Sequence, residues 1–254
     1  MNTKKNKTAN LSPDCLIYNG DSLQILKNID GNSVDLILTD PPYNLGKFMH
    51  DRATNMGKLR RNHFSATNWD HLDHSKWIEK MDQFLNESSR IIKTGGSLII
   101  FMSLMKIETI IQLAEKYKFY YKTTGVWHKK NPIPRNMRLH FVNSTEGWIY
   151  FTFKNKTGKF NYAGKMVHDF IETGLTPSTE KKFGGHPTQK PEALIKHFVR
   201  LLTDTDDLIL DPFMGSGTTG KIAVELGRKF VGIELSQKYY KVSKKRITSQ
   251  LRTL

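Results

Sequence analysis

The sequence feature that most constrains the fold is the stretch Leu-Ile-Leu-Asp-Pro-Phe-Met-Gly-Ser-Gly-Thr-Thr-Gly at residues 208–220. A short apolar run ends there in an acid, Asp211, and breaks into a glycine-rich turn, which predicts a buried strand that leads into a ligand loop. A helix closed by Gly227 and a strand over residues 230–234 should follow. This is a βαβ unit, and such units bind ligands at the carboxyl ends of their strands.

Three kinds of cofactor fit this loop to different degrees. Gly215, Gly217 and Gly220 match the G-x-G-x-x-G dinucleotide fingerprint, and Glu234 follows about where an acid would bind a ribose diol. A phosphate-binding P-loop fails, because Ile222 stands where a Ser or Thr should hold magnesium. Dinucleotides and S-adenosylmethionine both need a glycine turn and a carboxylate, so this unit alone does not separate them.

Composition limits the partners and the compartment. The 254 residues include 39 Lys and Arg against 24 Asp and Glu, and a formal charge of +15 favours a polyanionic partner, nucleic acid first. Cys15 is the single cysteine, so we expect no disulfide framework and no zinc site built on cysteines. His186 has no second ligand at suitable spacing, and we expect no metal. No run is long enough for a membrane span, which favours a soluble, cytoplasmic protein.

A second loop has a composition suited to a flat amine. The apolar run over residues 34–39 predicts a strand that ends in Asp40 and continues into Pro41, Pro42 and Tyr43. The two prolines fix the backbone and remove two amide donors, so carbonyl oxygens, the Asp40 carboxylate and the Tyr43 ring are presented together. Oxygens can accept hydrogen bonds from an exocyclic amine while the ring stacks on its base, although a rigid strand exit is the alternative.

Together these two motifs resemble the amino-methylating DNA methyltransferases, which use S-adenosylmethionine to methylate adenine N6 or cytosine N4. The motifs are Asp40-Pro-Pro-Tyr43 and the stretch from Asp211 to Thr219, and their order is similar to that of the permuted β class. The resemblance covers the chain from about residue 15 onward and favours S-adenosylmethionine over a dinucleotide. It implies double-stranded DNA as the partner, and leaves open a cognate restriction endonuclease and a homodimer.

The resemblance also implies which residues form the site. Asp40, Pro41, Pro42 and Tyr43 would hold the amine of a base that is flipped out of the duplex. Adenine N6 is favoured over cytosine N4, because Asp at the first motif position is typical of the adenine enzymes and Ser of the cytosine enzymes. The implied cofactor residues are Asp21, Asp211, Phe213, Gly215, Ser216, Gly217, Thr218 and Glu234, with Thr188 and Lys190 from a segment similar to the family's cofactor-tail motif.

Asp21 has a second interpretation. It ends a short predicted strand and precedes a predicted helix over residues 22–29, so it could cap that helix or face a ligand at the edge of the sheet. From the spacing alone, capping is the stronger interpretation.

Basic segments supply the candidate DNA contacts. An insertion over residues 46–75 has little apolar periodicity, and its charge favours closure over phosphates, with a solvated loop as the alternative. The proline-containing loop over residues 128–138 is predicted to line the substrate pocket, although a plain connector explains its composition nearly as well. By position, residues 154–185 correspond to the target-recognition segment of the β class. The candidate DNA-binding residues are Lys58, Arg60, Arg61, Lys129, Lys130, Arg135 and Arg138.

The remaining pattern predicts a three-layer, Rossmann-like α/β fold on a mainly parallel sheet. Residues 119–127 and 145–153 should pair as an antiparallel edge hairpin, and helices are expected over residues 75–92, 106–117, 192–202 and 237–251. The cations of the last helix, Arg246 included, are interpreted as a solvated face. We expect residues 1–13 to be a disordered basic tail and residues 14–254 to be one methyltransferase domain.

Two other classes of protein explain less of the sequence. A nicotinamide-dependent oxidoreductase would share the glycine turn and Glu234 but would leave the Asp40 to Tyr43 turn and the basic insertions unexplained. A DNA-binding protein without catalysis would explain the charge but not two ligand loops.

The basic insertion generates a first prediction. Replacing Lys58, Arg60 and Arg61 together by Gln should reduce the slope of log DNA affinity against log salt by about 3, because each lost phosphate contact removes about one released counterion. Fluorescence anisotropy with labelled duplex DNA at several salt concentrations measures this slope. An unchanged slope would favour the solvated loop.

Overall fold

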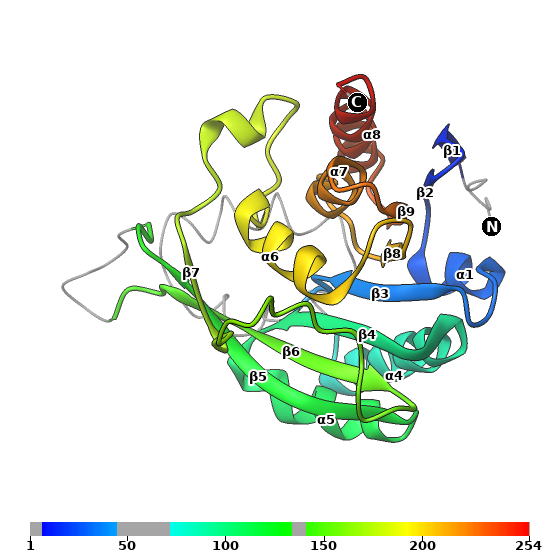
Figure 1. Cartoon of the computed structure of the whole chain (residues 1–254), viewed down its shortest axis with the longest axis vertical. Coiled ribbons are helices and arrows are strands. Elements are labelled where there is room, and N and C mark those ends of the chain that lie inside the picture. Colours follow the sequence, from blue (N-terminus) through cyan, green and yellow to red (C-terminus); the bar gives the residue numbers. More distant parts are fainter. Residues whose placement is uncertain (1–6, 45–71, 134–140, 254) are drawn as a thin grey trace.

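A computed structural model describes residues 7–44, 72–133 and 141–253. In this part of the chain the strands form one nine-stranded sheet in the order β1-β2-β9-β8-β3-β4-β6-β5-β7 (Figure 1). Neighbouring strands from β2 to β4 are parallel. Their bounds are Cys15–Asn19 for β2, Lys229–Glu234 for β9, Leu208–Asp211 for β8, Val34–Thr39 for β3 and Ile92–Met102 for β4.

The other end of the sheet is mixed. β6 (Thr145–Phe153) lies antiparallel between β4 and β5 (Phe119–Lys129), which confirms the predicted antiparallel hairpin. The edge strand β7 (Phe170–Thr173) runs parallel to β5 and was not predicted, since its four residues carry no apolar alternation. Because β6 runs against its neighbours, its first residues lie at the sheet edge where the parallel strands end.

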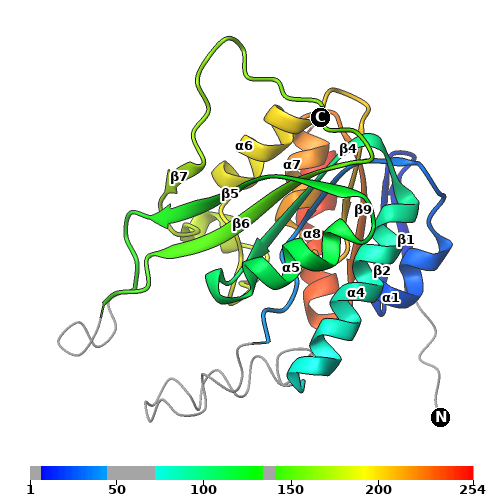
Figure 2. The ribbon, with the colours of Figure 1, turned by 90° about the horizontal axis from the view of Figure 1, so that it is seen from below.

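Helices cover both faces of the sheet and make three layers (Figures 1 and 2). One hydrophobic core packs α1 (Ser22–Ile25), α4 (His74–Ile91) and α5 (Ile107–Glu115) on one face. A second core packs α6 (Glu192–Leu202), α7 (Thr218–Glu225) and α8 (Gln237–Leu251) on the other face. Short 3-10 turns occupy Leu26–Asn28, Leu104–Lys106 and Ser178–Lys181.

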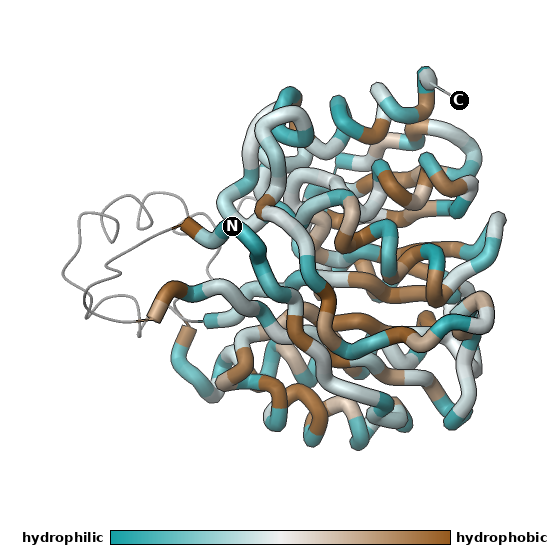
Figure 3. Tube along the Cα trace, turned by 60° about the vertical axis from the view of Figure 1, so that its left-hand side comes forward, coloured by the Kyte–Doolittle hydropathy of each residue, from teal (hydrophilic) through white to brown (hydrophobic). Residues whose placement is uncertain are grey.

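The helical spacing of apolar residues explains this arrangement. In α4 the side chains of Trp77, Met81, Phe84 and Leu85 share one face and are fully buried. Figure 3 shows hydrophobic residues concentrated along the strands at the centre of the molecule, with hydrophilic residues on outward turns. No helix within the described ranges is long and apolar enough to span a membrane.

The prediction of a disordered tail is wrong for its second half. Residues Lys7–Ser12 form β1, an edge strand that pairs antiparallel with β2. Within it Ala9 and Leu11 alternate with polar residues and pack against the hydrophobic core. This pattern of two residues is too short to stand out in a polar segment, and the backbone pairing offered by β2 completes the strand. Residues 1–6 lie outside the described part of the chain.

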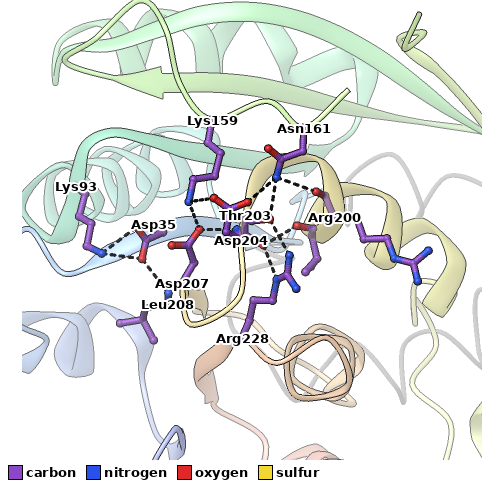
Figure 4. Close-up of polar contacts among 11 residues, drawn as sticks. Asp35, Lys93, Lys159, Asn161, Arg200, Thr203, Asp204, Asp207, Leu208 and Arg228 are labelled. Carbon is purple, nitrogen blue, oxygen red and sulfur yellow. Dashed lines mark hydrogen bonds and ion pairs between the residues drawn. The ribbon is translucent and has the colours of Figure 1, made fainter. Parts of the chain in front are cut away.

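The segment that leaves β6 is fixed at the amino edge of the sheet (Figure 4). Lys159 pairs with Asp204 at 2.8 Å and with Asp207 at 2.5 Å, just before β8 begins. Asn161 donates to the carbonyl oxygen of Thr203 at 3.1 Å, and Arg228 donates to the same carbonyl at 2.8 Å. This first part of the expected recognition segment, 154–185, is therefore held at the edge opposite to the loops of Asp40 and Asp211.

Candidate active site

The two predicted loops meet at the centre of the sheet. β3 and β8 are neighbours, so Asp40 and Asp211 emerge side by side although they are far apart in sequence. The hydroxyl of Thr39, directly before Asp40, donates to Asp211 Oδ1 at 3.0 Å. This hydrogen bond thus joins the start of the predicted amine-binding turn to the start of the glycine turn.

Asp211 is a buried carboxylate held by hydroxyl and amide donors. Besides Thr39, it accepts from the Thr219 hydroxyl at 2.7 Å and from the backbone N–H of Phe213 at 3.2 Å. Burial raises the pKa of Asp211 to about 7, against the effect of these hydrogen bonds. Asp211 therefore stabilises the glycine turn by accepting hydrogen bonds from residues on both sides of it.

The glycine turn has the backbone form that its sequence predicts. Gly215 and Gly217 both have positive φ, 51° and 78°, which favours glycine. The backbone N–H of Gly215 donates to Glu234 at 3.0 Å, which places the carboxylate expected to bind a ribose directly against the turn. Burial raises the pKa of Glu234 to about 7.

The side chains of the turn point into the protein. Ser216 donates to the side-chain carbonyl of Gln189 at 3.0 Å, and Thr218 accepts from Arg246 at 3.0 Å. Arg246 also donates to Gln189 at 3.0 Å and is 2% exposed, so its assignment to a solvated face is wrong. The hydroxyls of Ser216 and Thr218 are therefore bonded within the protein, and their role in cofactor binding stays a prediction.

The segment before α6 packs over the same turn. The ring of His186 lies edge-on to Tyr239 at 4.2 Å between centroids, and burial lowers the pKa of His186 to about 4. The hydroxyl of Thr188 is exposed and lies 3.2 Å from His186 Nδ1. Gln189 ties this segment to the glycine turn, and Lys190, the next residue, reaches the other loop.

Lys190 and Tyr43 occupy the two oxygens of Asp40. The Tyr43 hydroxyl donates to Oδ1 at 2.6 Å, and the Lys190 ammonium donates to Oδ2 at 2.5 Å. Lys190 was predicted among the cofactor residues, but its ammonium contacts Asp40 in the predicted catalytic turn, residues 40–43. Its position there follows from the anchoring of Gln189.

Glu146, which the sequence analysis missed, completes this cluster. It is the second residue of β6, and its carboxylate lies 3.1 Å from Lys190 and 2.6 Å from Lys129. Lys129 was predicted to contact DNA, but its ammonium is paired here with Glu146 and is only 12% exposed. No local spacing signals this role, because β6 brings Glu146 to the site only after the sheet has formed.

The charges of this cluster depend on one another. Burial raises the pKa of Asp40 and Glu146 adds to the rise, whereas Lys190 and Tyr43 oppose it. Burial also disfavours the charge of Lys190, but Asp40 and Glu146 outweigh this effect and raise the pKa of its ammonium. Lys190 and Lys129 similarly outweigh burial at Glu146 and lower the pKa of its carboxyl.

Two partly buried hydrogen bonds hold the rest of the predicted catalytic turn. The indole N–H of Trp77 donates to the carbonyl oxygen of Pro42 at 3.0 Å, so this core residue of α4 also holds the turn. The side-chain amide of Asn44 donates to the carbonyl oxygen of Leu72 at 2.9 Å. The Pro42 carbonyl thus already accepts one hydrogen bond, and the binding role of the Pro41 carbonyl stays a prediction.

Comparison with known proteins shows the family of the chain. A family model described as DNA methylase, covering N6 and N4 methyltransferases, matches residues 34–245. The chain belongs to this family of DNA methylases. The predicted resemblance is thereby confirmed, together with methyl transfer as the activity and S-adenosylmethionine as the methyl donor of the family.

Two relatives of the methylase match over nearly their whole length. The type II methyltransferase M2.LlaDCHI of Lactococcus lactis subsp. cremoris is 32% identical over 246 residues, which cover 92% of this chain and 89% of that protein. The type II methyltransferase M2.DpnII of Streptococcus pneumoniae is 31% identical over 250 residues, which cover 94% of this chain and 91% of that protein.

Solved structures agree with the fold. The complex of M1.HpyAVI with SAM is 29% identical, with a TM-score of 0.69, and the match covers 92% of this chain and 98% of that one. The cytosine-N4-specific PvuII DNA methyltransferase is 20% identical with a TM-score of 0.73, and the match covers 95% of this chain and 92% of that one. At that identity the second likeness shows the fold alone.

The other predicted site residues of the methylase lie as follows. Asp21 accepts from the backbone N–H of Leu23 at 2.8 Å and caps α1, as its spacing favoured. Phe213 packs edge-on against Phe84 at 5.7 Å between centroids. Lys130 is exposed and pairs with Glu172 at 3.1 Å. Lys58, Arg60, Arg61, Arg135 and Arg138 lie outside the described residues.

The glycine turn generates a second prediction. A Cβ on Gly217 would lie 2.7 Å from Ser243 Cβ, whereas a Cβ on Gly215 would meet only His186, at 3.6 Å. Gly217→Ala should therefore lower the free energy of unfolding by about 3 kcal/mol, by strain and overpacking, and Gly215→Ala by only about 1 kcal/mol, by strain. Urea denaturation measures both changes. Equal losses would contradict the steric argument.

Proposed function

We propose that this methylase transfers the methyl group of S-adenosylmethionine to the exocyclic N6 of adenine in double-stranded DNA. The observation that carries the proposal is the hydrogen bond from Thr39 to Asp211, which sets the amine-binding turn beside the glycine turn. Transfer between two bound molecules requires this adjacency, because alignment of the reacting atoms supplies much of the rate.

The residues at the glycine turn suit S-adenosylmethionine. Glu234 would accept hydrogen bonds from the ribose hydroxyls, and the positive-φ backbone at Gly215 and Gly217 allows close approach of the ligand. When bound, S-adenosylmethionine supplies an electrophilic methyl group, so the protein needs no covalent intermediate. Asp21, at the end of β2, lies at the same edge of the sheet.

The catalytic turn would bind the base. Asp40 and the Pro41 carbonyl would accept the two N–H groups of the amine and direct its lone pair toward the methyl group, while the Tyr43 ring stacks on the base. The nitrogen would bond to the methyl carbon as the sulfur–methyl bond breaks and S-adenosylhomocysteine leaves. The methylated amine would lose its proton to water only afterwards, so Asp40 need not act as a base before attack. A duplex hides this amine, and the target adenine must therefore be flipped out.

A charged acceptor such as Asp40 can serve the exocyclic amine of adenine or of cytosine. Adenine is favoured because Asp at the first motif position is typical of the adenine enzymes of the family and Ser of the cytosine enzymes. Methylation at cytosine C5 would instead need a reactive cysteine. Cys15 is 1% exposed, and burial raises the pKa of its thiol to about 12. The cytosine N4 reaction remains the second candidate.

The net charge of the protein and its relatives support proposals about its partners and its biological role. The net charge of +15 favours association with the DNA backbone. The relatives are type II methyltransferases, which supports a role in restriction and modification with a cognate endonuclease. We propose that the protein is cytoplasmic and forms a homodimer. The proposed DNA contacts are Lys58, Arg60, Arg61, Lys130, Arg135 and Arg138.

The third prediction tests the reaction itself. DNA methylated by the purified protein should yield N6-methyladenine when it is digested to nucleosides and analysed by mass spectrometry. Asp40→Asn should lower the rate roughly a hundredfold or more, since a charged acceptor is lost at the reacting amine. Its affinity for S-adenosylmethionine, measured by calorimetry, should stay within about twofold, because Asp40 acts on the base.

Each outcome has a distinct meaning. N4-methylcytosine as the sole product would replace adenine by cytosine and keep the catalytic turn. Substantial activity in Asp40→Asn would contradict the role of the turn. Asp14→Asn is the matched control, because Asp14 is an exposed acid remote from the site that should not affect the rate.

A fourth prediction concerns pH. Burial raises the pKa of Glu234 to about 7, and the ribose hydroxyls need its ionised form as acceptor. Cofactor affinity should therefore fall as pH drops through about 7, by roughly tenfold for each pH unit below that value. Glu234→Gln should bind more weakly at pH 8, and the gap to wild type should narrow at pH 6. Calorimetry measures both affinities at each pH, and their ratio is free of any titration of the cofactor itself. A ratio of affinities that does not change with pH would contradict the prediction.

A further inference from the structure

Two partners of Asp40 have a second acceptor in common. Lys190 Nζ lies 2.5 Å from Asp40 Oδ2 and 3.1 Å from Glu146 Oε2. The Tyr43 hydroxyl lies 2.6 Å from Asp40 Oδ1 and 3.5 Å from the same Glu146 oxygen. Both groups that bind Asp40 therefore lie between Asp40 and Glu146.

This arrangement matters because the proposed function needs Asp40 for another donor. A carboxylate that already binds an ammonium and a phenol is a weakened acceptor for an amine, since each donor withdraws electron density. When the amine of the target base arrives, Lys190 or Tyr43 must loosen its hold on Asp40. Glu146 Oε2 is already within reach of both.

We propose that Glu146 is a positioning residue that shares the Lys190 ammonium with Asp40, and so sets how freely Asp40 can accept the amine of the target base. The proposal rests on the proposed function, in that it assumes an exocyclic amine at Asp40. It goes beyond that function by assigning a role to a residue on β6 that belongs to neither sequence motif.

The surroundings of Glu146 support a Lys190 ammonium that is shared by Asp40 and Glu146, as opposed to an ion pair of Lys190 with one of them. Lys129 Nζ lies 2.6 Å from Glu146 Oε1 and engages the oxygen that faces away from Lys190. The cluster therefore contains two carboxylates and two ammonium groups and has no net charge. Without Glu146 it would carry a surplus positive charge, and Lys190, which is 6% exposed, would have Asp40 as its remaining acidic partner.

The charged and titratable groups that face Asp40 come from several elements. Lys190 approaches from the segment before α6, Glu146 from β6, Tyr43 from the catalytic turn itself and Asp211 from β8. Lys129 of β5 acts through Glu146. Of these, Glu146 is an acid that can be neutralised without removing a donor or acceptor of either motif.

The first test is the pH profile of methyl transfer in a single turnover with Glu146→Gln. Transfer requires ionised Asp40, so the rate rises with pH through the pKa of Asp40, a pKa that Glu146 helps to raise. In the variant this acid limb should move to lower pH by about one unit. The rate at the plateau should fall roughly ten- to hundredfold, because Lys190 then stays on Asp40.

A second variant should shift the acid limb of the pH profile in the opposite direction. Lys129→Gln removes the other partner of Glu146, so Glu146 draws Lys190 away from Asp40 and the acid limb should move to higher pH. Glu172→Gln is the matched control. Glu172 is also paired with a lysine beside β5, but it contacts His128 and Lys130 and should leave the limb unchanged.

An NMR titration of the Asp40 carboxyl tests the sharing of Lys190 without measuring catalysis. In protein labelled with 13C at aspartate carboxyls, the Asp40 signal, identified by its loss in Asp40→Asn, should titrate at lower pH in Glu146→Gln and at higher pH in Lys129→Gln. Urea denaturation checks that each variant is folded. If Glu146→Gln does not fold, the Lys129→Gln titration decides.

The outcomes separate this inference from the proposed function. Limbs and carboxyl titrations that shift in opposite directions in the two variants support the sharing of Lys190. If Glu146→Gln is slower but its acid limb and its Asp40 carboxyl titration do not move, the ion pair is purely structural and the inference is overturned. An unchanged rate of methyl transfer in Glu146→Gln would also overturn it. N4-methylcytosine from wild type would instead contradict the choice of adenine and leave the titrations to decide the role of Glu146.

Discussion

The hydrogen bond between Thr39 and Asp211 is the contact on which the rest of the site depends. It can form only because β3 and β8 are neighbours in the sheet, although the chain visits the amine-binding turn long before the glycine turn. Burial of Asp211 requires such donors, since an unsatisfied carboxylate in the core is costly. The same bond that satisfies a buried acid thus fixes the relative position of two binding sites.

A second set of contacts holds the segment before α6 against both turns. Gln189 is bound by Ser216 and by the buried guanidinium of Arg246, and the next residue, Lys190, extends to Asp40 and Glu146. The cofactor turn and the amine-binding turn are therefore connected twice, once through the sheet and once through this segment. These two sets of polar contacts hold the turns in one relative position.

The sequence predicts what is encoded locally and misses what depends on pairing between distant segments. Asp40 and Asp211 follow apolar runs and precede proline or glycine, so both turns could be predicted. β1 alternates only at Ala9 and Leu11 and β7 does not alternate, so both strands depend on the backbone partners that a neighbouring strand offers. Glu146 and Arg246 appear as ordinary charged residues of a strand and a helix until the fold places them together.

The anchoring of Lys159 and Asn161 at the far edge of the sheet has a consequence for how such a protein can change. The chain that follows Asn161 leaves from a fixed point remote from the reacting groups, and it rejoins the sheet at β7. The length of a loop between two fixed ends affects stability only weakly. This stretch can therefore be lengthened or replaced at little cost in stability while the two turns at the opposite edge of the sheet keep their positions.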